Sequence, residues 1–524
     1  MKWKKRALAL LVAGLAALGG CDRARSDGGA LVDDVPVSDA YFGLAWYQNG
    51  TLDPVRERAA VDRVLCEALY EGLFEVTDNF TAEPVLCDSY TGDGTTFTFT
   101  LRDDVRFWSG APLTAADVVA SWNAARYDEQ SPYHGRMAEV GSIEALSDDT
   151  VRVVLTSPNI DLPRLLDIPI YRAGSATSGD FADGTGPYQP VGEGRSWMLE
   201  PNQDWHGGRL GSIRHITLVV LPRADAALSS FQTGDVSLMR ASRISVDPPN
   251  VGGSVETAQT RSAVLHYLGL DHDHPALSDP RVRQALSAAL PRQSLCDTAY
   301  QTFADPAVLP VNPQPPDLAG SLSMDADHAR AARLLRQALG GADDDDADTD
   351  PDDIDDDVAD DEPAPDTDPD AVLLTLRLLV NEENPFKVAA AEQIAASWNA
   401  IGGVRVTVEQ RPFDTYLSML RSGDFDVYYG ETQLTADLDL RPLVAAGGRL
   451  NYGGCGSRAL RAAVAAARRG EDVAGLHRLF AEELPFLPLA FERGQIILRK
   501  GLIDDYAPAP YNAFAGAEDW RIAQ

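Results

Sequence analysis

Residues 97–122 of the 524-residue chain read FTFTLRDDVRFWSGAPLTAADVVASW, and this stretch says most about the fold. Its first part alternates apolar and polar residues, which places Phe97 and Phe99 on one face, as in a half-buried β-strand. Two aspartates then turn the chain. Its second part contains the capping box TAAD (114–117), which predicts a helix over 115–125.

The sequence on either side continues this alternation of strands and helices. Further strands are predicted over 150–155, 215–221, 264–270, 373–380, 404–408 and 425–429. Further helices are predicted over 224–233, 280–290, 327–339, 385–400, 413–422, 458–467 and 472–483. Strands that alternate with helices in this way indicate an α/β fold.

The composition is that of a globular protein of two to four domains, with 44% hydrophobic and 24% charged residues. The formal net charge is −34, from 45 basic and 79 acidic residues. Binding to a phosphate backbone needs clustered lysine and arginine, so we do not expect a nucleic-acid partner. No stretch after the N-terminal segment is long and apolar enough to span a membrane.

Half of the net charge lies in one segment, since residues 343–370 contain 17 acidic residues and no basic ones. This segment has little to bury, so we expect a disordered insertion over 341–370, between a helix and a strand of one domain. Calcium binding is a weaker alternative, because Pro351 stands where an EF-hand loop requires glycine. We expect no metal site here or at Asp271–His274, which is better explained as a polar loop.

The N-terminus has the pattern of an export signal. Residues 1–6 are basic and residues 7–20 are apolar, which predicts a signal peptide over 1–20. The segment ends in LGGC, with small residues before Cys21, and resembles the lipobox of bacterial lipoproteins. That resemblance implies that the thiol of Cys21 carries a diacylglycerol. The segment after it is rich in Asp, Gly and Ser, which predicts a flexible tether over 21–30. An ordinary signal peptide with a chance cysteine is the alternative.

Export implies an oxidising compartment, where disulfides persist. Four cysteines follow Cys21 and allow three pairings: Cys66, Cys87, Cys296 and Cys455. Cys66 with Cys87 closes a short loop and is the favoured pair, which leaves Cys296 with Cys455. Buried free thiols are the alternative.

Six segments along the chain form an ordered set. They are LDP (52–54) with VLCEALYEGL (64–73), residues 97–122, GTGPY (184–188), GD (234–235), DPRVRQAL (279–286), and residues 398–406 with GDFD (423–426). In this order they resemble family 5 of the extracellular solute-binding proteins, which includes the oligopeptide- and dipeptide-binding proteins of ABC importers. Each motif on its own is a fold signal, and GTGPY is best explained as a turn without contact to a ligand.

The resemblance implies a two-lobed α/β fold of the periplasmic binding proteins (type II), with discontinuous lobes joined by two hinge segments. Mapped onto this chain, lobe I is expected over 31–262 and 486–524, with an extra subdomain at about 55–165. Lobe II is expected over 263–485 and contains the acidic insertion. Such a fold closes around a ligand between its lobes.

In peptide-binding members of the family a carboxylate pairs with the peptide ammonium, after a Gly-Trp pair that follows the "FD" strand. The corresponding stretch here contains Glu431 where tryptophan is usual. The resemblance therefore implies Asp437 or Asp439 as the ligand carboxylate. Capping of the next helix is the alternative for these two aspartates.

Aromatic side chains and one arginine complete the candidate ligand site. Tyr133 resembles a tyrosine that borders the peptide site, and Trp46 follows the first predicted strand with other aromatic residues around it. Tyr428 and Tyr429 are expected on the other side. Arg441 could pair with a ligand carboxylate, and a surface ion pair is its alternative.

The resemblance implies a binding protein without a catalytic step or cofactor. We expect a monomer that binds a peptide or another small molecule and delivers it to an ABC permease with its ATPase. The lipid anchor implies the outer face of the bacterial cytoplasmic membrane. The alternatives are a sensor or chaperone without transport and an anchored hydrolase, although the GxSxG and HExxH motifs are absent.

Overall fold

A computed structural model describes residues 41–48, 52–177, 180–194, 196–210, 213–245, 254–316, 323–340 and 372–521. The predicted signal peptide (1–20), the tether (21–30) with Cys21, and the acidic insertion (341–370) lie outside these residues. None of the described helices is both long and apolar enough to cross a membrane.

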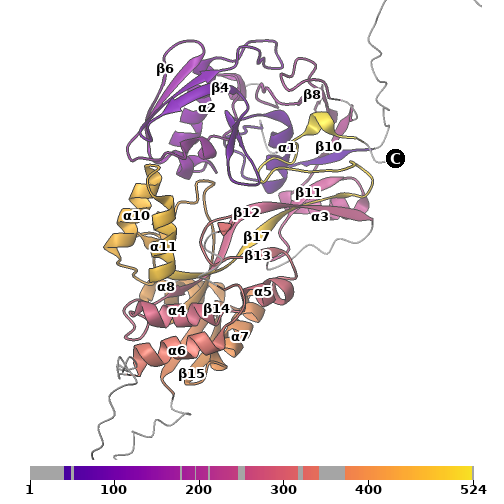
Figure 1. Cartoon of the computed structure of the whole chain (residues 1–524). Coiled ribbons are helices and arrows are strands. Elements are labelled where there is room, and N and C mark those ends of the chain that lie inside the picture. The colour runs from indigo at the N-terminus through magenta and orange to yellow at the C-terminus, as the bar shows by residue number, and fades with distance from the viewer. Residues whose placement is uncertain are drawn as a thin grey trace, which may run out of the picture. The chain divides into compact units, whose positions relative to one another are not determined.

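Two long antiparallel strands form the centre of a seven-stranded mixed sheet with the order β11-β17-β12-β16-β14-β15, in which β13 also pairs with β17. Strand β12 (Val255–Leu270) pairs with β17 (Phe486–Arg499) from Val255 opposite Arg499 to Gly269 opposite Phe486. Figure 1 shows the two strands side by side. Their length is unusual, because β-strands commonly contain about five or six residues.

These two strands contribute to more than one hydrophobic core. The first core, which we define by its buried residues from Phe42 to Leu238, also includes Ile496 and Leu498 of β17. The second core is defined by buried residues between Ala263 and Phe491, together with Val76, Phe80 and Ile244. One end of β17 therefore packs in the first core, whereas at its other end β17 packs together with β12 in the second.

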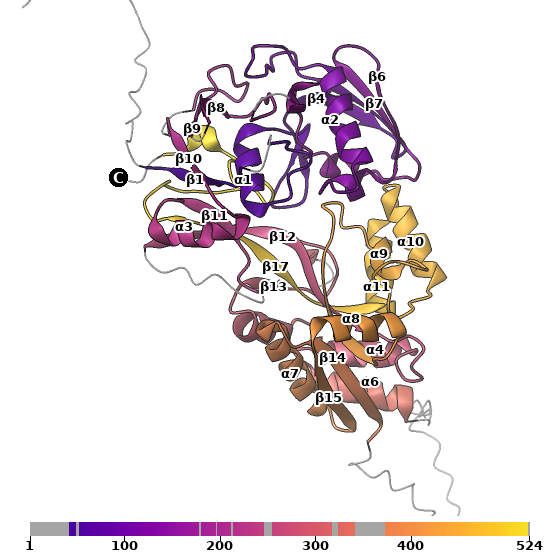
Figure 2. The same cartoon turned by 180° about the vertical axis from the view of Figure 1, so that it is seen from behind.

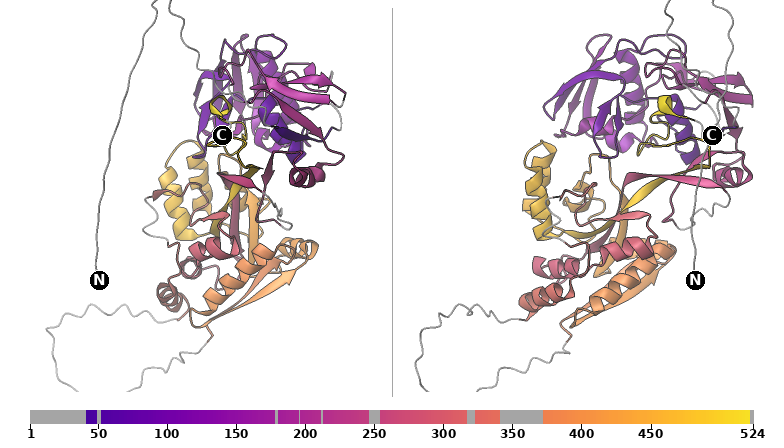
Figure 3. Two further views of the ribbon diagram at one scale, coloured as in Figure 1. Left: turned by 90° about the vertical axis from the view of Figure 1, so that its right-hand side faces the viewer. Right: turned by 45° about the vertical axis from the view of Figure 1, so that its right-hand side comes forward.

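The second core is built on the parallel strands β14 (Leu374–Asn381) and β15 (Val404–Arg411), beside β16 (Val427–Gln433). Figures 2 and 3 show α7 running along these strands. The helices of this core are α4 (Pro280–Ala288), α6 (His328–Leu339), α7 (Pro385–Asn399), α8 (Phe413–Ser422), α9 (Arg441–Val444), α10 (Arg458–Arg468) and α11 (Val473–Glu483).

Side-chain caps start several of these helices where the sequence predicts them. The carboxylates of Asp279 and Asp327 accept backbone N–H groups at the starts of α4 and α6, and Asn384 does so at the start of α7. Each cap satisfies a donor that has no partner inside its helix. Pro280 is the first residue of α4, where its missing N–H costs nothing.

The first core contains smaller sheets. One has the order β4-β5-β7-β6, and another the order β1-β10-β9-β8. Their strands are β1 (Gly43–Trp46), β4 (Cys87–Gly92), β5 (Thr96–Leu101), β6 (Val140–Ala145), β7 (Thr150–Leu155), β8 (Tyr188–Glu193), β9 (Ser196–Pro201) and β10 (Ile216–Val220). A hairpin of β2 (Phe74–Val76) and β3 (Ala82–Pro84) stands beside them.

The helices of the first core are α1 (Ala60–Leu69), α2 (Ala115–Tyr127) and the short α3 (Ala227–Thr233). Helix α2 has the predicted capping box, in which Asp117 accepts the backbone N–H and the hydroxyl of Thr114 at 2.9 and 2.6 Å. Strands β11 (Leu238–Ala241) and β13 (Ala304–Pro306) flank β17.

The four cysteines after Cys21 are buried free thiols in this structure. The expected bridges Cys66–Cys87 and Cys296–Cys455 are not formed, and the alternative of free thiols describes the structure. Cys66 lies on α1, whereas the thiol of Cys87 donates a hydrogen bond to the carbonyl of Ser89 at 3.2 Å. Burial raises the pKa of Cys87 and of Cys296 to about 12, so both stay protonated at neutral pH.

Candidate ligand-binding site

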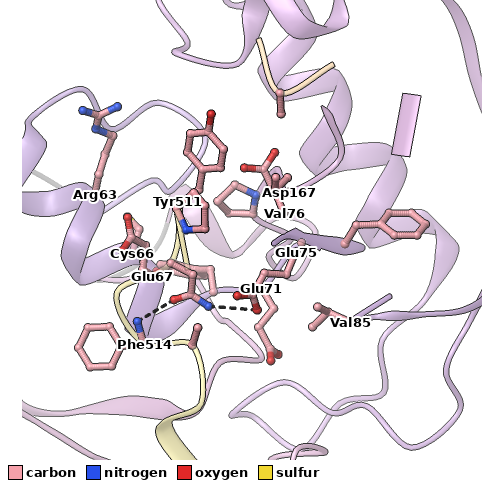
Figure 4. A pocket seen from close by; sticks show the side chains of 18 of the residues that line it. Arg63, Cys66, Glu67, Glu71, Glu75, Val76, Val85, Asp167, Tyr511 and Phe514 are labelled. Carbon is pink, nitrogen blue, oxygen red and sulfur yellow. Dashed lines mark hydrogen bonds between the residues drawn. The ribbon is translucent and has the colours of Figure 1, made fainter. Parts of the chain in front are cut away.

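A cavity of about 690 Å³ is lined by residues of both cores (Figure 4). The first core contributes side chains of α1 together with Phe74 and Phe514, whereas the lining residues Val76 and Tyr511 belong to or pack against the second core. The second core contributes Ser262, Ala263 and the segment 433–436 at the end of β16. A volume of this size is in the range of small-molecule sites, which are commonly about 300–1,000 Å³.

One wall of the cavity is aromatic and contains an ion pair. The guanidinium of Arg136 lies 5.2 Å from the ring centre of Tyr133 and 5.8 Å from that of Tyr511, and it pairs with the carboxylate of Asp167. Stacking on two rings and pairing with one carboxylate fix the orientation of this arginine. The wall therefore offers aromatic surface beside a charge that is already neutralised.

A second ion pair holds the C-terminal segment against α1. The Glu67 carboxylate accepts from the Arg240 guanidinium at 2.9 Å and from the backbone N–H of Ala513 at 2.7 Å. Arg240 also donates to the carbonyl of Pro510 at 3.2 Å. These contacts fix residues 510–513, which form part of the cavity wall.

Glu71 joins two of the sequence motifs at the cavity. Its carboxylate accepts from the hydroxyl of Thr185 and the indole N–H of Trp205, both at 2.9 Å, and lies 3.1 Å from Nε2 of His206. The glycines beside Thr185 are required for packing, because a Cβ on Gly184 or Gly186 would lie 2.4 Å from backbone atoms of Leu69. Both the YEGL and the GTGPY motif therefore shape the cavity.

Glu75 of β2 has fewer partners than the carboxylates of Glu67, Glu71 and Asp167. Among the described residues, its carboxylate has one hydrogen-bond donor, the side-chain amide of Asn512 at 3.5 Å. Burial raises the pKa of Glu75 to about 7, and the nearby carboxylates Glu71, Glu518 and Asp167 add to the effect. Figure 4 shows Glu75 near Glu71 and Val85.

Strand β16 of the second core ends at the cavity. Strand β16 pairs with β12 along its length, and the backbone N–H of Leu434 donates to the carbonyl of Ala263 at 2.9 Å. On its other side β14 pairs only with Val427 and Tyr428 of β16. Within the described residues, the edge of β16 after Tyr428 is therefore not paired with a strand, and it leads to the cavity-lining segment 433–436.

Of the eight ligand-site residues predicted from the sequence, Tyr133 lines the cavity. Asp437 directly follows the lining segment 433–436. Its carboxylate accepts from the Asn159 amide at 2.9 Å and lies 3.4 Å from Nη1 of Arg468. Asp437 is therefore adjacent to the cavity but already engaged.

Asp439 and Arg441 form a tight pair next to Asp437. Two guanidinium nitrogens of Arg441 donate to Asp439 at 2.8–2.9 Å, and the same carboxylate accepts the backbone N–H of Arg441 at 3.0 Å. Arg441 and Arg468 both pair with Glu139 of the first core. Helix capping by Asp439 and an ion pair at Arg441, the alternatives in the sequence analysis, are the contacts that the structure contains.

The other four predicted residues do not line the cavity. Trp46 is buried in the first core, with its ring centre 4.8 Å from that of Phe181. Tyr428 and Tyr429 are buried in the second core, and Glu431 pairs with the ammonium of Lys387 at 2.9 Å. The packing of the three aromatic side chains leaves no surface for a ligand in this conformation, whereas Glu431 is exposed and engaged by Lys387.

The Asp271–His274 segment is a polar loop. The carbonyl of Pro485 lies 2.8 Å from Nε2 of His272, and Nδ1 of His274 accepts backbone N–H groups. Among the described residues, no three His, Cys, Asp or Glu side chains are grouped to hold a metal ion.

Sequence reasoning missed most of the cavity lining, including Glu67, Glu71, Glu75, Arg136 and Tyr511. A signal was present for Glu71, since YEGL and GTGPY both belong to the ordered motif set. The C-terminal segment carried no motif, so its place beside α1 had no signal in the sequence.

A cavity bounded by two cores that two strands connect is the arrangement of a two-lobed α/β ligand-binding protein. The family model of the bacterial extracellular solute-binding proteins, family 5 middle region, matches residues 81–440, and the chain belongs to this family. The resemblance stated from the motifs and the predicted fold class are confirmed.

Known relatives agree with this assignment. The glutathione-binding protein GsiB of Salmonella typhi is 26% identical over 308 residues, a match that covers 55% of this chain and 59% of GsiB. The chain thus matches only about three fifths of the length of that relative. The periplasmic murein tripeptide-binding protein MppA in an unliganded open form has a TM-score of 0.71 at 18% identity, covering 94% of this chain and 99% of MppA.

The oligopeptide-binding protein AppA of Bacillus subtilis, in complex with a nonapeptide, has a TM-score of 0.56 at 17% identity. That similarity covers 93% of this chain and 99% of AppA. At such identities the two solved structures establish a similar fold.

Proposed function

We propose that this chain is the extracytoplasmic substrate-binding subunit of an ABC importer and that its ligand is a short peptide. The observation that carries the proposal is the cavity lined by both cores, at which the edge of β16 ends. An extended peptide can add to a strand edge through main-chain hydrogen bonds, which bind any sequence alike. GsiB, MppA and AppA, whose names or structures involve glutathione, a murein tripeptide and a nonapeptide, support a peptide ligand.

In the proposed binding mode, different parts of the cavity contact the main chain, the side chains and the ammonium of the peptide. Backbone groups of 433–436 pair with the peptide main chain, and Tyr133 and Tyr511 pack against its side chains. Asp437 pairs with the peptide ammonium, in exchange for its present contact with Arg468. We favour Asp437 over Asp439, because Asp437 directly follows the cavity-lining segment 433–436.

Binding without chemical conversion is part of the proposal. Cys66 is the thiol that lines the cavity, and burial raises its pKa well above the usual range, so it is a poor nucleophile. Glu67, Glu71 and Asp167 are held by donors that fix their positions. None of these groups pairs a nucleophile with a base in the manner of a hydrolase.

We further propose that residues 31–262 with 486–524 and residues 263–485 act as lobes I and II, with β12 and β17 as the hinges. Ligand binding would favour the closed form, and an ABC permease would recognise that form. Attachment to the outer face of the membrane through a lipid on Cys21 is proposed from residues 1–21 alone.

Isothermal titration calorimetry of the full chain tests peptide binding. We expect one site per chain for di- and tripeptides, with micromolar or tighter Kd, and peptides recovered intact by mass spectrometry. Glutathione serves as one probe and a disaccharide as a matched non-peptide control. Absence of heat for every peptide, or recovery of cleaved peptide, would contradict the proposal.

A further inference from the structure

The carboxylates around the cavity differ in their partners. Glu67 and Asp167 each pair with an arginine, and Glu71 is bound by three donors. Glu75 has only the amide of Asn512, at a distance near the limit of a hydrogen bond. No lysine, arginine or histidine of the described residues forms an ion pair with it. Glu75 therefore lines the cavity as a half-buried carboxyl group without a cation.

The position of Glu75 is fixed by its strand. It lies in β2 between Phe74 and Val76, whose side chains are buried, and β2 pairs with β3 through Glu75 opposite Glu83. The amide of Asn512 is itself oriented, because its oxygen accepts the backbone N–H of Phe514 at 2.8 Å. Figure 4 shows this chain of hydrogen bonds at the cavity wall.

The surroundings of Glu75 suit a cation on an alkyl chain. Val76 and Val85 provide apolar lining, and the exposed Glu518 adds a second negative charge to the same cavity. An unpaired carboxyl group in such a place is costly to ionise, as the pKa of about 7 indicates. A bound cation would remove that cost, since it supplies the missing charge partner.

We propose that Glu75 binds the ammonium or guanidinium of a lysine or arginine side chain in the peptide ligand. This proposal rests on the proposed function above and adds a preference for basic peptides. The side chain rather than the peptide terminus is assigned to Glu75, because Glu75 lies on β2, whereas Asp437 follows the segment 433–436 at the end of β16. One extended peptide can reach both walls.

Calorimetry with matched peptides tests the proposal on the full chain. The probes are trialanine peptides that contain one lysine at each position in turn, and the same peptides with norleucine, which has the same alkyl chain length without the ammonium. We expect the wild-type protein to prefer lysine over norleucine roughly tenfold or more at one position. In Glu75→Gln that preference is lost, while the norleucine peptide binds as before.

The control variant is Glu83→Gln, on the strand opposite Glu75, which is exposed and does not line the cavity. We expect it to keep the lysine preference. Equal affinity of wild type for lysine and norleucine peptides at every position would overturn the role of Glu75 but leave peptide binding intact. Equal weakening of both peptides by Glu75→Gln would also overturn it. If no tripeptide binds the wild type, both the proposed function and this inference fail.

Discussion

Burial raises the pKa of two side-chain carboxyl groups, those of Asp62 and Glu75, to about 7. Asp62 on α1 is fully buried. One of its oxygens accepts the backbone N–H of Tyr47 at 2.7 Å, and the other has no hydrogen-bond partner. Because its folded-state pKa lies above the unfolded value, folding takes up a proton at this site between about pH 4 and 7.

We therefore expect Asp62 to lower the free energy of unfolding as the pH rises through 7. In Asp62→Asn the acceptor for Tyr47 remains and the charge is absent. At pH 8 the variant should be more stable than the wild type by about 1–3 kcal/mol, and at pH 4 the two should be equal within about 0.5 kcal/mol. Urea denaturation at both pH values measures this. Asp103→Asn, at an exposed position, is the control and should change neither value.

We expect the preference for a lysine peptide over a norleucine peptide to depend on pH, because the protonation of Glu75 changes near pH 7. A raised pKa near 7 means that the free protein is mostly protonated at this site at pH 6, so a lysine peptide must displace a proton to bind. The carboxylates of Glu71, Asp167 and Glu518 favour the protonation of Glu75, and the cations that line the same cavity include Arg136 and Arg240, which are paired with Asp167 and Glu67. Affinity for the lysine peptide should rise roughly tenfold from pH 6 to pH 8 relative to the norleucine peptide. A constant ratio would contradict the assigned pKa.

Variants of Asp437 and Asp439 distinguish a carboxylate that binds the peptide ammonium from one that only stabilises the protein. We expect Asp437→Asn to weaken tripeptide binding roughly tenfold, since a charge-assisted contact with the ammonium is lost. Asp439→Asn, which breaks a pair that stays inside the protein, should have a smaller effect. Calorimetry with one tripeptide and its N-acetylated form measures both. If the acetylated form binds as tightly as the free one, Asp437 does not bind the ammonium.

Two of the predicted ligand residues are buried because of the strand on which they lie. Tyr428 and Tyr429 lie in the first part of β16, residues 427–430, which is buried on both faces within the second core. A strand buried on both faces does not reveal which side faces a ligand, because both sides are apolar. The sequence pattern placed the strand correctly but could not select its exposed residues.

At the scale of elements, the capping box of α2 is the part of the fold that the sequence specified most fully. The Asp117 carboxylate also accepts the backbone N–H of Ala173 at 2.8 Å, and it is nearly fully buried. We expect Asp117→Ala to lower the free energy of unfolding by roughly 2–4 kcal/mol, since three donors lose their acceptor. Chemical denaturation measures the change, with the exposed Glu129→Ala as control. A loss below about 1 kcal/mol would contradict this account.

Most predicted elements are present because their signals are local. The helix over 385–400 and the strand over 404–408 correspond to α7 and β15, whose cap and alternation are visible in the sequence. Helix α1 and strand β17 were not predicted as such. Strand β17 is apolar over most of its length and contains Pro488, so its pattern resembles neither an alternating strand nor a helix.

The whole molecule depends on contacts between residues of the two cores. Glu139 of the first core pairs with Arg441 and Arg468 of the second, and the backbone N–H of Ile160 donates to the carbonyl of Arg468 at 2.8 Å. Such long-range contacts have no local signal. The resemblance to a family predicted two lobes around a ligand, but the cavity lining required the three-dimensional structure.

We expect Glu139→Gln to weaken the link between the cores, because two guanidinium groups lose their shared anion. Peptide release should become roughly three- to tenfold faster, as measured by stopped-flow tryptophan fluorescence. Glu144→Gln is the matched control, since Glu144 lies in the strand β6 that follows Glu139 and pairs with Arg152 of the same core. An unchanged release rate in Glu139→Gln would show that these ion pairs do not stabilise the bound form.

Native mass spectrometry of the full chain mixed with defined tripeptides tests the central claim most directly. The account predicts a complex of one chain with one peptide, from which the peptide is released at its original mass. A complex with a metal or a sugar in place of the peptide, release of peptide fragments, or no complex at peptide concentrations well above micromolar would contradict it.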